Sequence, residues 1–164
     1  MNAKLTFQRK LFSSNEKEVL ETLNILTEKG YPEIVTDIIK VFIEHPSAEV
    51  KNSAVFILNN LKEKASVPHF MEGLKTSKNS SHALLVSACW QNGLDFSPYL
   101  SFFTEIIARE EIEIAIEAYS VIESNISLLS DEDLENYKKE FDKICKMKTV
   151  KNKNLLDEIR TFFI

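Results

Sequence analysis

Residues 47–76 read SAEVKNSAVFILNNLKEKASVPHFMEGLKT, and their pattern gives the clearest indication of the fold. In the first half, apolar residues recur at intervals of three and four, as on the core-facing side of an α-helix: Val50, Ala54, Ile57, Leu58 and Leu61. Ser47 precedes this run at a preferred N-cap position, and Pro68 stands in the first turn of the next helix, where its missing N–H costs nothing. The stretch predicts two consecutive helices joined by a short loop.

The same helical spacing extends through the rest of the chain in both directions. Three glycines and four prolines leave little punctuation for the turns of an all-β protein, so helix dominates the expectation. Ser13 and Glu16 have the spacing of a capping box, and so do Ser130 and Asp133. About nine helices with short loops, and therefore antiparallel neighbours, are predicted over residues 15–29, 32–45, 47–61, 68–76, 81–94, 98–108, 111–125, 131–144 and 154–164.

Three prolines mark the start of successive helix pairs. Pro32, Pro68 and Pro98 stand at the same point of the segments YPEIV, VPHFM and SPYLS, 36 and 30 residues apart. A recurrence at this period is typical of helical repeat proteins, in which each unit is one helical hairpin that stacks on its neighbours. The quoted stretch therefore reads as one unit of an array.

The array resembles the HEAT-repeat family, including small bacterial HEAT-like proteins of similar length. Val50, Lys51, Ala54, Leu58 and Leu61 match the second-helix pattern Val-Arg-x-x-Ala-x-x-x-Leu, with lysine in the arginine place. A second unit matches at Leu84, Ala88, Gly93 and Pro98, and a weaker third at Ile114, Ala118 and Ile122, whereas Leu85, Ala115 and Asn92 depart from the pattern. The resemblance implies an all-α, short right-handed α-α superhelix forming one domain over 1–164, with an N-terminal segment at 1–12, the clearest repeats at 31–126 and capping helices at 131–164.

Composition narrows the class of partner and compartment. The net charge of −5 and the sequence pI of about 5.3 oppose the basic balance of most nucleic-acid binders. Cys89 and Cys145 have no CxxC spacing, which favours two reduced thiols. The opening MNAKLTFQRKLF lacks the apolar core of a signal peptide. Uncharged apolar runs such as residues 55–58 are far shorter than the roughly 20 residues that span a bilayer. We expect a soluble, cytoplasmic protein without a membrane partner.

The residue pattern provides no catalytic constellation. His45, His69 and His82 are 24 and 13 residues apart, so no HExxH or HxxxH geometry arises. The iron-binding HEAT-like hydroxylases use His-Glu pairs, and the nearest match here is the reversed Glu44–His45. Glycine-rich phosphate loops and nucleophile elbows are absent from the sequence. We therefore predict no enzyme activity, no metal site and no cofactor.

Charge is segregated in the C-terminal third of the sequence. Residues 105–135 contain ten acidic residues against Arg109, whereas residues 138–153 contain seven lysines against Glu140 and Asp142. A basic partner on the acidic segment, an anionic one on the lysines, or simply a solvated polar surface are all compatible with this pattern. The alternative function is a nucleic-acid-binding HEAT-like protein that resembles the alkyl-base DNA glycosylases or uses the C-terminal lysines, although Glu123 and its acidic neighbours would oppose a DNA backbone.

The predicted function is a non-enzymatic protein-interaction module that binds a protein or peptide on the concave face of a short α-solenoid. The resemblance places second helices on that face, where aromatic residues would form a hot-spot ridge; the alternative is that these rings pack between helices. The predicted partner-binding residues are Phe56, Trp90, Tyr119, Asn52, Asn59, Glu113 and Glu117. The sequence leaves open the oligomeric state, and whether Phe162 and Phe163 dock on their own chain or on another.

Overall fold

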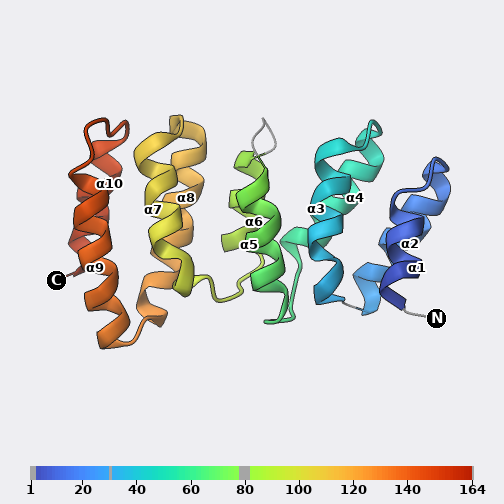
Figure 1. The fold of residues 1–164 in the computed structure, drawn as a ribbon, viewed down its shortest axis with the longest axis horizontal. Helices are drawn as coiled ribbons and strands as arrows, with labels where there is room; N and C mark the ends of the chain where they lie inside the picture. Colours follow the sequence, from blue (N-terminus) through green and yellow to red (C-terminus); the bar gives the residue numbers. More distant parts are fainter. Residues whose placement is uncertain (1–2, 30, 78–81, 164) are drawn as a thin grey trace. The chain divides into compact units, whose positions relative to one another are not determined.

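The computed structural model describes residues 3–29, 31–77 and 82–163 of the 164-residue chain, and these residues are helical with no strand. The α-helices of this part, labelled in Figure 1, are α1 (Ala3–Leu11), α2 (Glu16–Lys29), α3 (Val35–Glu44), α4 (Ala48–Asn59), α5 (Ser66–Thr76), α6 (His82–Gln91), α7 (Leu100–Arg109), α8 (Ile112–Asn125), α9 (Asp131–Cys145) and α10 (Lys153–Arg160). Four 3-10 turns accompany them, namely η1 (Pro32–Ile34), η2 (Ser97–Tyr99), η3 (Ile126–Leu128) and η4 (Thr161–Phe163). The predicted all-α class is confirmed.

Helix α1 is the element that the sequence reading lacked. Its Leu11 is fully buried, its Phe7 ring lies 4.7 Å from the ring of Tyr31 between centroids, and its Gln8 Nε2 donates to Asp37 Oδ2 at 2.9 Å. A helix of nine residues is marginal on its own in water, so these tertiary contacts are what stabilise it. The number of predicted α-helices, about nine, is corrected to ten over the described residues.

Local signals placed most of the other helices correctly. The Oγ of Ser47 accepts from the backbone N–H of Val50 at the start of α4, and the Oγ of Ser130 accepts from the N–H of Asp133 at the start of α9. Pro32 and Pro98 each lie in a 3-10 turn that leads into a helix. The ends of two predicted helices, Ser81 and Ile164, lie outside the described residues.

The predicted capping box at the start of α2 is wrong. Because the helix begins at Glu16, Asn15 takes the N-cap position, and its Oδ1 accepts from the N–H of Lys17 at 3.1 Å. Ser13 instead accepts from the N–H of Asn15 at 3.2 Å. Glu16 Oε1 accepts from the Ser47 hydroxyl at 2.6 Å, which ties the start of α2 to the start of α4.

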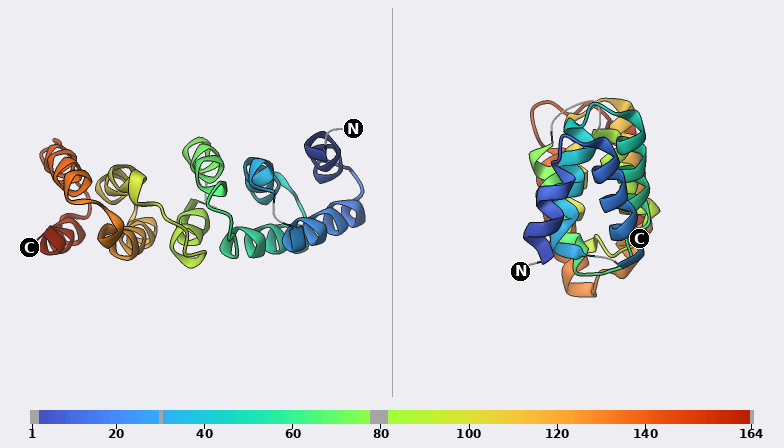
Figure 2. Two further views of the ribbon diagram at one scale, coloured as in Figure 1. Left: turned by 90° about the horizontal axis from the view of Figure 1, so that it is seen from below. Right: turned by 90° about the vertical axis from the view of Figure 1, so that its right-hand side faces the viewer.

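The chain divides into two compact units, unit 1 (Met1–Leu94) and unit 2 (Asp95–Ile164). Within unit 1 the helices form two layers: α3 contacts α1 and α5 in one, and α4 contacts α2 and α6 in the other (Figure 2). The buried stripes predicted for these helices form the core between the layers, with Val19 and Leu23 from α2, Ile38 from α3 and Leu58 from α4. Hydrophobic burial of these stripes is the main stabilising term.

Unit 2 repeats the two-layer pairing with four helices. Helix α7 packs against α8 and α9, and α10 packs against α8 and α7. The C-terminal end of α7 is held by the segment before α10, because Asn152 Nδ2 donates to the carbonyl oxygens of Ile107 at 2.8 Å and Glu110 at 3.0 Å. The Lys151 N–H donates to the Ala108 carbonyl at 2.9 Å, so this loop satisfies carbonyls that a helix end leaves without partners.

The phenylalanines near the C-terminus dock on their own chain. The ring of Phe163 lies 5.0 Å from that of Phe141 and 5.8 Å from that of Tyr137, and Phe162 lies 6.0 Å from Tyr119. Superhelix formation and the single domain over 1–164 stay predictions. None of the described helices is long and apolar enough to cross a bilayer.

Candidate functional site

Two exposed aromatic side chains of unit 1 occupy equivalent positions on contacting helices. The motif alanines Ala54 on α4 and Ala88 on α6 are fully buried, as the repeat pattern predicted. Two residues further on, about 200° around each helix, Phe56 is 57% exposed and Trp90 is 41% exposed. These two predicted site residues therefore point away from the core, and we call them the Phe56–Trp90 face.

A shallow groove of about 520 Å³ between α2 and α4 borders this face. Its lining consists of amide, hydroxyl, carboxylate and aromatic side chains: Asn24, Thr27, Glu28, Asn52, Ser53 and Phe56. The structure thus brings together two predicted site residues, Phe56 and Asn52. The amides of Asn24 and Asn52 offer both donors and acceptors, as a peptide backbone requires.

The groove continues towards the C-terminal ends of α2 and α4. A second hollow of about 190 Å³ shares Thr27 and Glu28 with the first and is lined further by Tyr31, Leu61 and neighbouring residues. Sequence reasoning missed the α2 side, because Asn24, Thr27 and Glu28 precede the segment that resembles HEAT repeats. Their spacing of three and four polar positions on α2 was the available signal.

Asn59 lies on α4 but is not part of this groove lining. Its side chain is half-buried, and its Oδ1 atom is buried without a hydrogen-bond partner in the part of the chain that the structure describes. A buried oxygen is not accessible to an approaching partner. Of the two predicted asparagines, Asn52 is therefore the one with an exposed side chain.

The remaining predicted site residues belong to unit 2. Tyr119 is half-buried on α8 against the Phe162 ring, and Glu113 is exposed on the same helix, with Glu117 half-buried. Partial burial raises the pKa of Tyr119, and the charges of Glu123 and Glu158 raise it further. The ridge of Phe56, Trp90 and Tyr119 spans both units and stays a prediction.

Of the two cysteine thiols, Cys89 is buried and Cys145 is half-buried. Burial raises the pKa of the Cys89 thiol well above its usual value and raises that of Cys145 as well, so both are poor nucleophiles at neutral pH. Among residues 3–29, 31–77 and 82–163, no group of three or more His, Cys, Asp or Glu side chains is arranged to hold a metal ion.

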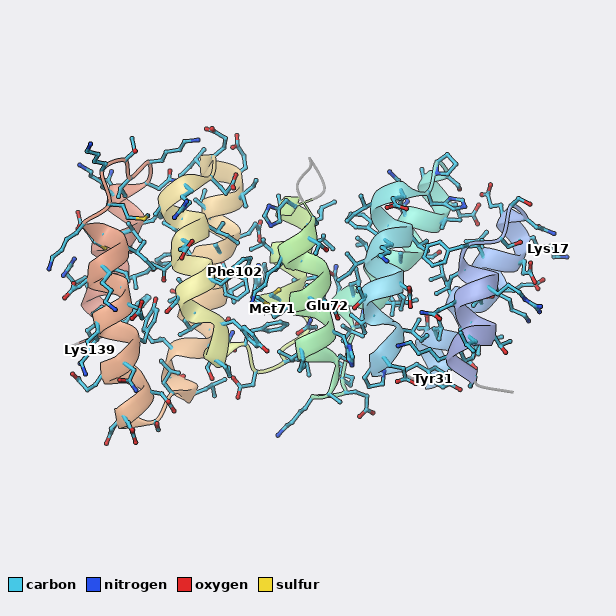
Figure 3. All side chains as sticks on the ribbon, in the orientation of Figure 1. Lys17, Tyr31, Met71, Glu72, Phe102 and Lys139 are labelled. Carbon is cyan, nitrogen blue, oxygen red and sulfur yellow. The ribbon has the colours of Figure 1, made fainter. Side chains whose placement is uncertain are left out.

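Some lysines of unit 2 are engaged in ion pairs, and Lys139 on α9 is exposed (Figure 3). The Nζ–Oε1 distances are 2.7 Å for Lys138–Glu135, 2.6 Å for Lys143–Glu140 and 2.7 Å for Lys151–Glu111. Carboxylates thus neutralise part of the lysine run.

Comparison of the chain with models of protein families, with curated proteins and with solved structures found no match.

Proposed function

We propose that the protein is a non-enzymatic interaction module that binds an extended protein or peptide segment on the Phe56–Trp90 face of unit 1. The observation that supports this proposal is the exposure of two large aromatic rings at equivalent positions on contacting helices. Tryptophan and other aromatic residues are enriched at binding hot spots, where their burial provides much of the affinity.

The chemistry of the adjoining groove supports a peptide rather than a charged polymer. Among the lining residues that the structure describes, Glu28 carries the only formal charge, and the other polar groups are neutral amides and hydroxyls. Asn24 and Asn52 can each donate to a main-chain carbonyl and accept from a main-chain N–H. Phe56, at the edge of the same groove, offers an apolar surface for one partner side chain.

Intrinsic fluorescence provides the most direct test, because Trp90 is the single tryptophan of the sequence. Peptides selected from a random display library on the wild-type protein should shift the Trp90 emission to the blue as the indole is desolvated. Their affinity should fall about tenfold in Phe56→Ala and in Trp90→Ala, as for hot-spot aromatics. Binding of Trp90→Ala is measured by calorimetry.

Leu5→Ala provides the matched control, because Leu5 is an exposed apolar residue on α1, in the other layer of unit 1. Circular dichroism verifies that each variant keeps its helix content. Equal affinity for wild type and both aromatic variants would contradict the proposal. Binding to a labelled DNA duplex that weakens steeply with salt would instead favour the nucleic-acid alternative.

A further inference from the structure

Helix α8 of unit 2 carries an apolar stripe with two exposed isoleucines that the sequence reading did not single out. Ile112 is 47% exposed and Ile116 is 49% exposed, and they lie one helical turn apart at i and i+4. Tyr119 follows three residues later on the same line of the helix, with its ring against Phe162. We call Ile112, Ile116, Tyr119 and the adjoining Phe162 the α8 stripe.

Helix α10 runs beside α8 in the same direction. The Lys151–Glu111 ion pair of 2.7 Å joins the segments before the two helices, and the Tyr119–Phe162 ring contact joins them further along. Because α10 packs on α8 over this length, it forms one border of the α8 stripe. Within unit 2, Ile112 and Ile116 are left exposed beside that border.

Carboxylates surround the α8 stripe. Glu123 is exposed one turn after Tyr119 on α8, Glu158 is exposed on α10 four residues before Phe162, and the charges of both raise the pKa of Tyr119. Glu113 is exposed on α8 next to Ile112. Over residues 95–164, Asp and Glu number 15 and Lys and Arg number 9. Unit 2 therefore carries a net negative charge, which attracts an approaching cation before it makes contact.

We propose that the α8 stripe is a second docking surface, which binds a basic amphipathic segment of a partner protein. The apolar side of that segment would cover Ile112, Ile116 and Tyr119, and its lysine or arginine side chains would lie against the flanking carboxylates. This surface lies within unit 2, so it does not depend on the Phe56–Trp90 face. Nucleic acid and anionic membranes are disfavoured as occupants by the same negative charge, and so is the equivalent acidic surface of a second copy.

The test uses a fluorescein-labelled synthetic helix of about 18 residues, with leucine at i, i+3, i+4 and i+7 and lysine on the flanks. Fluorescence anisotropy with the full-length protein measures its affinity at about 50 and about 300 mM NaCl. Ile112→Ser and Ile116→Ser should each weaken binding about tenfold. Glu123→Gln with Glu158→Gln should weaken it severalfold at low salt and reduce the salt dependence.

Three matched controls should leave affinity within about twofold. Leu128→Ser removes another exposed apolar residue of unit 2, Glu132→Gln removes another exposed carboxylate, and Leu5→Ala alters unit 1. No binding, equal binding of a scrambled peptide with the same charge, or equal loss in Leu128→Ser and Glu132→Gln would overturn the proposal. Self-association that disappears in Ile116→Ser, measured by sedimentation equilibrium, would overturn it in favour of a second copy.

Discussion

Unit 1 and unit 2 use the same two-layer pairing of helices but carry different charge. Lys and Arg number 11 and Asp and Glu 10 over residues 1–94, whereas the corresponding numbers over residues 95–164 are 9 and 15. One ion pair is found within the described part of unit 1 and five within that of unit 2. The negative charge of the protein is thus a property of unit 2.

The two units also differ in how their helices are held together. In unit 1, aliphatic stripes meet closely, and Gly73 of α5 allows Ile39 of α3 to approach. In unit 2, an aromatic cluster of Tyr137, Phe141 and Phe163 joins α9 to the segment after α10. The same pairing of helices is thus stabilised by close backbone approach in one unit and by aromatic packing in the other. Neither kind of packing fixes the residues on the surface, so the two surfaces can differ.

The largest expected effect comes from Phe141→Ala. The ring is fully buried, lies 6.1 Å from Tyr137 and 5.0 Å from Phe163 between centroids, and has the Arg160 guanidinium 5.3 Å from its centre. Removal of a buried phenylalanine ring costs about 3–5 kcal/mol. Urea denaturation should show this loss, and hydrogen exchange should quicken in α9 and α10.

Phe70→Ala is the counterpart in unit 1, because Phe70 of α5 is fully buried as well. It should quicken exchange in α3 and α5 and leave α9 and α10 protected. Equally faster hydrogen exchange in α3, α5, α9 and α10 in either variant would contradict separate stability of the two units, because the two cores would then behave as one cooperative unit.

Asn152→Ala should have the next largest effect. Its amide donates to two carbonyl oxygens at the end of α7, and its loss leaves both partly buried acceptors without this donor. We expect a destabilisation of about 2 kcal/mol by urea denaturation. Asn154→Ala, an exposed neighbour on α10, is the control and should cost less than about 0.5 kcal/mol. Equal stability of the two variants would show that the hydrogen bonds from Asn152 to the end of α7 contribute nothing to the free energy of unfolding.

Local patterns in the sequence predicted most of the helices and part of the candidate site. The Ser47 and Ser130 caps and the buried Ala54 followed from spacing, because each depends on neighbours within one or two turns, whereas Ala88 was singled out by its match to the repeat pattern. Phe56 was placed outward by the same register. Periodicity was sufficient to predict features that depend on a single helix.

The features that sequence reasoning missed depend on contacts between distant segments. Asn152 lies 45 residues from Ile107, whose carbonyl it binds, and Phe162 is far from Tyr119 in sequence. No local pattern reports such contacts. Helix α1 had a weak signal, because Phe7 and Leu11 stand at i and i+4, but alternating polar residues obscured it.

Gly73→Ala tests the close approach in unit 1. A Cβ at this position would lie 2.6 Å from Cδ1 of Ile39 and 3.3 Å from its Cβ and Cγ2. Overpacking costs about 1–3 kcal/mol, and the better helix propensity of alanine offsets about 1 kcal/mol, so we expect a net loss of about 1 kcal/mol by urea denaturation. In the background of Ile39→Val, which removes Cδ1, the same change should be neutral or stabilising. A stabilising effect of Gly73→Ala in the wild type would show that the close approach of α5 to Ile39 does not require a glycine.

The smallest expected effect concerns the ion pairs that distinguish unit 2. In Lys143→Gln the 2.6 Å pair with Glu140 is lost, but both side chains are at least half exposed, and exposed pairs contribute about 0–1 kcal/mol. We expect a change below about 0.5 kcal/mol in urea denaturation, with no dependence on salt beyond that of the wild type. A loss above about 1 kcal/mol would mean that charge stabilises unit 2 directly. Near-neutrality would show that this pair does not stabilise unit 2, although its charges still contribute to the field that an approaching cation meets.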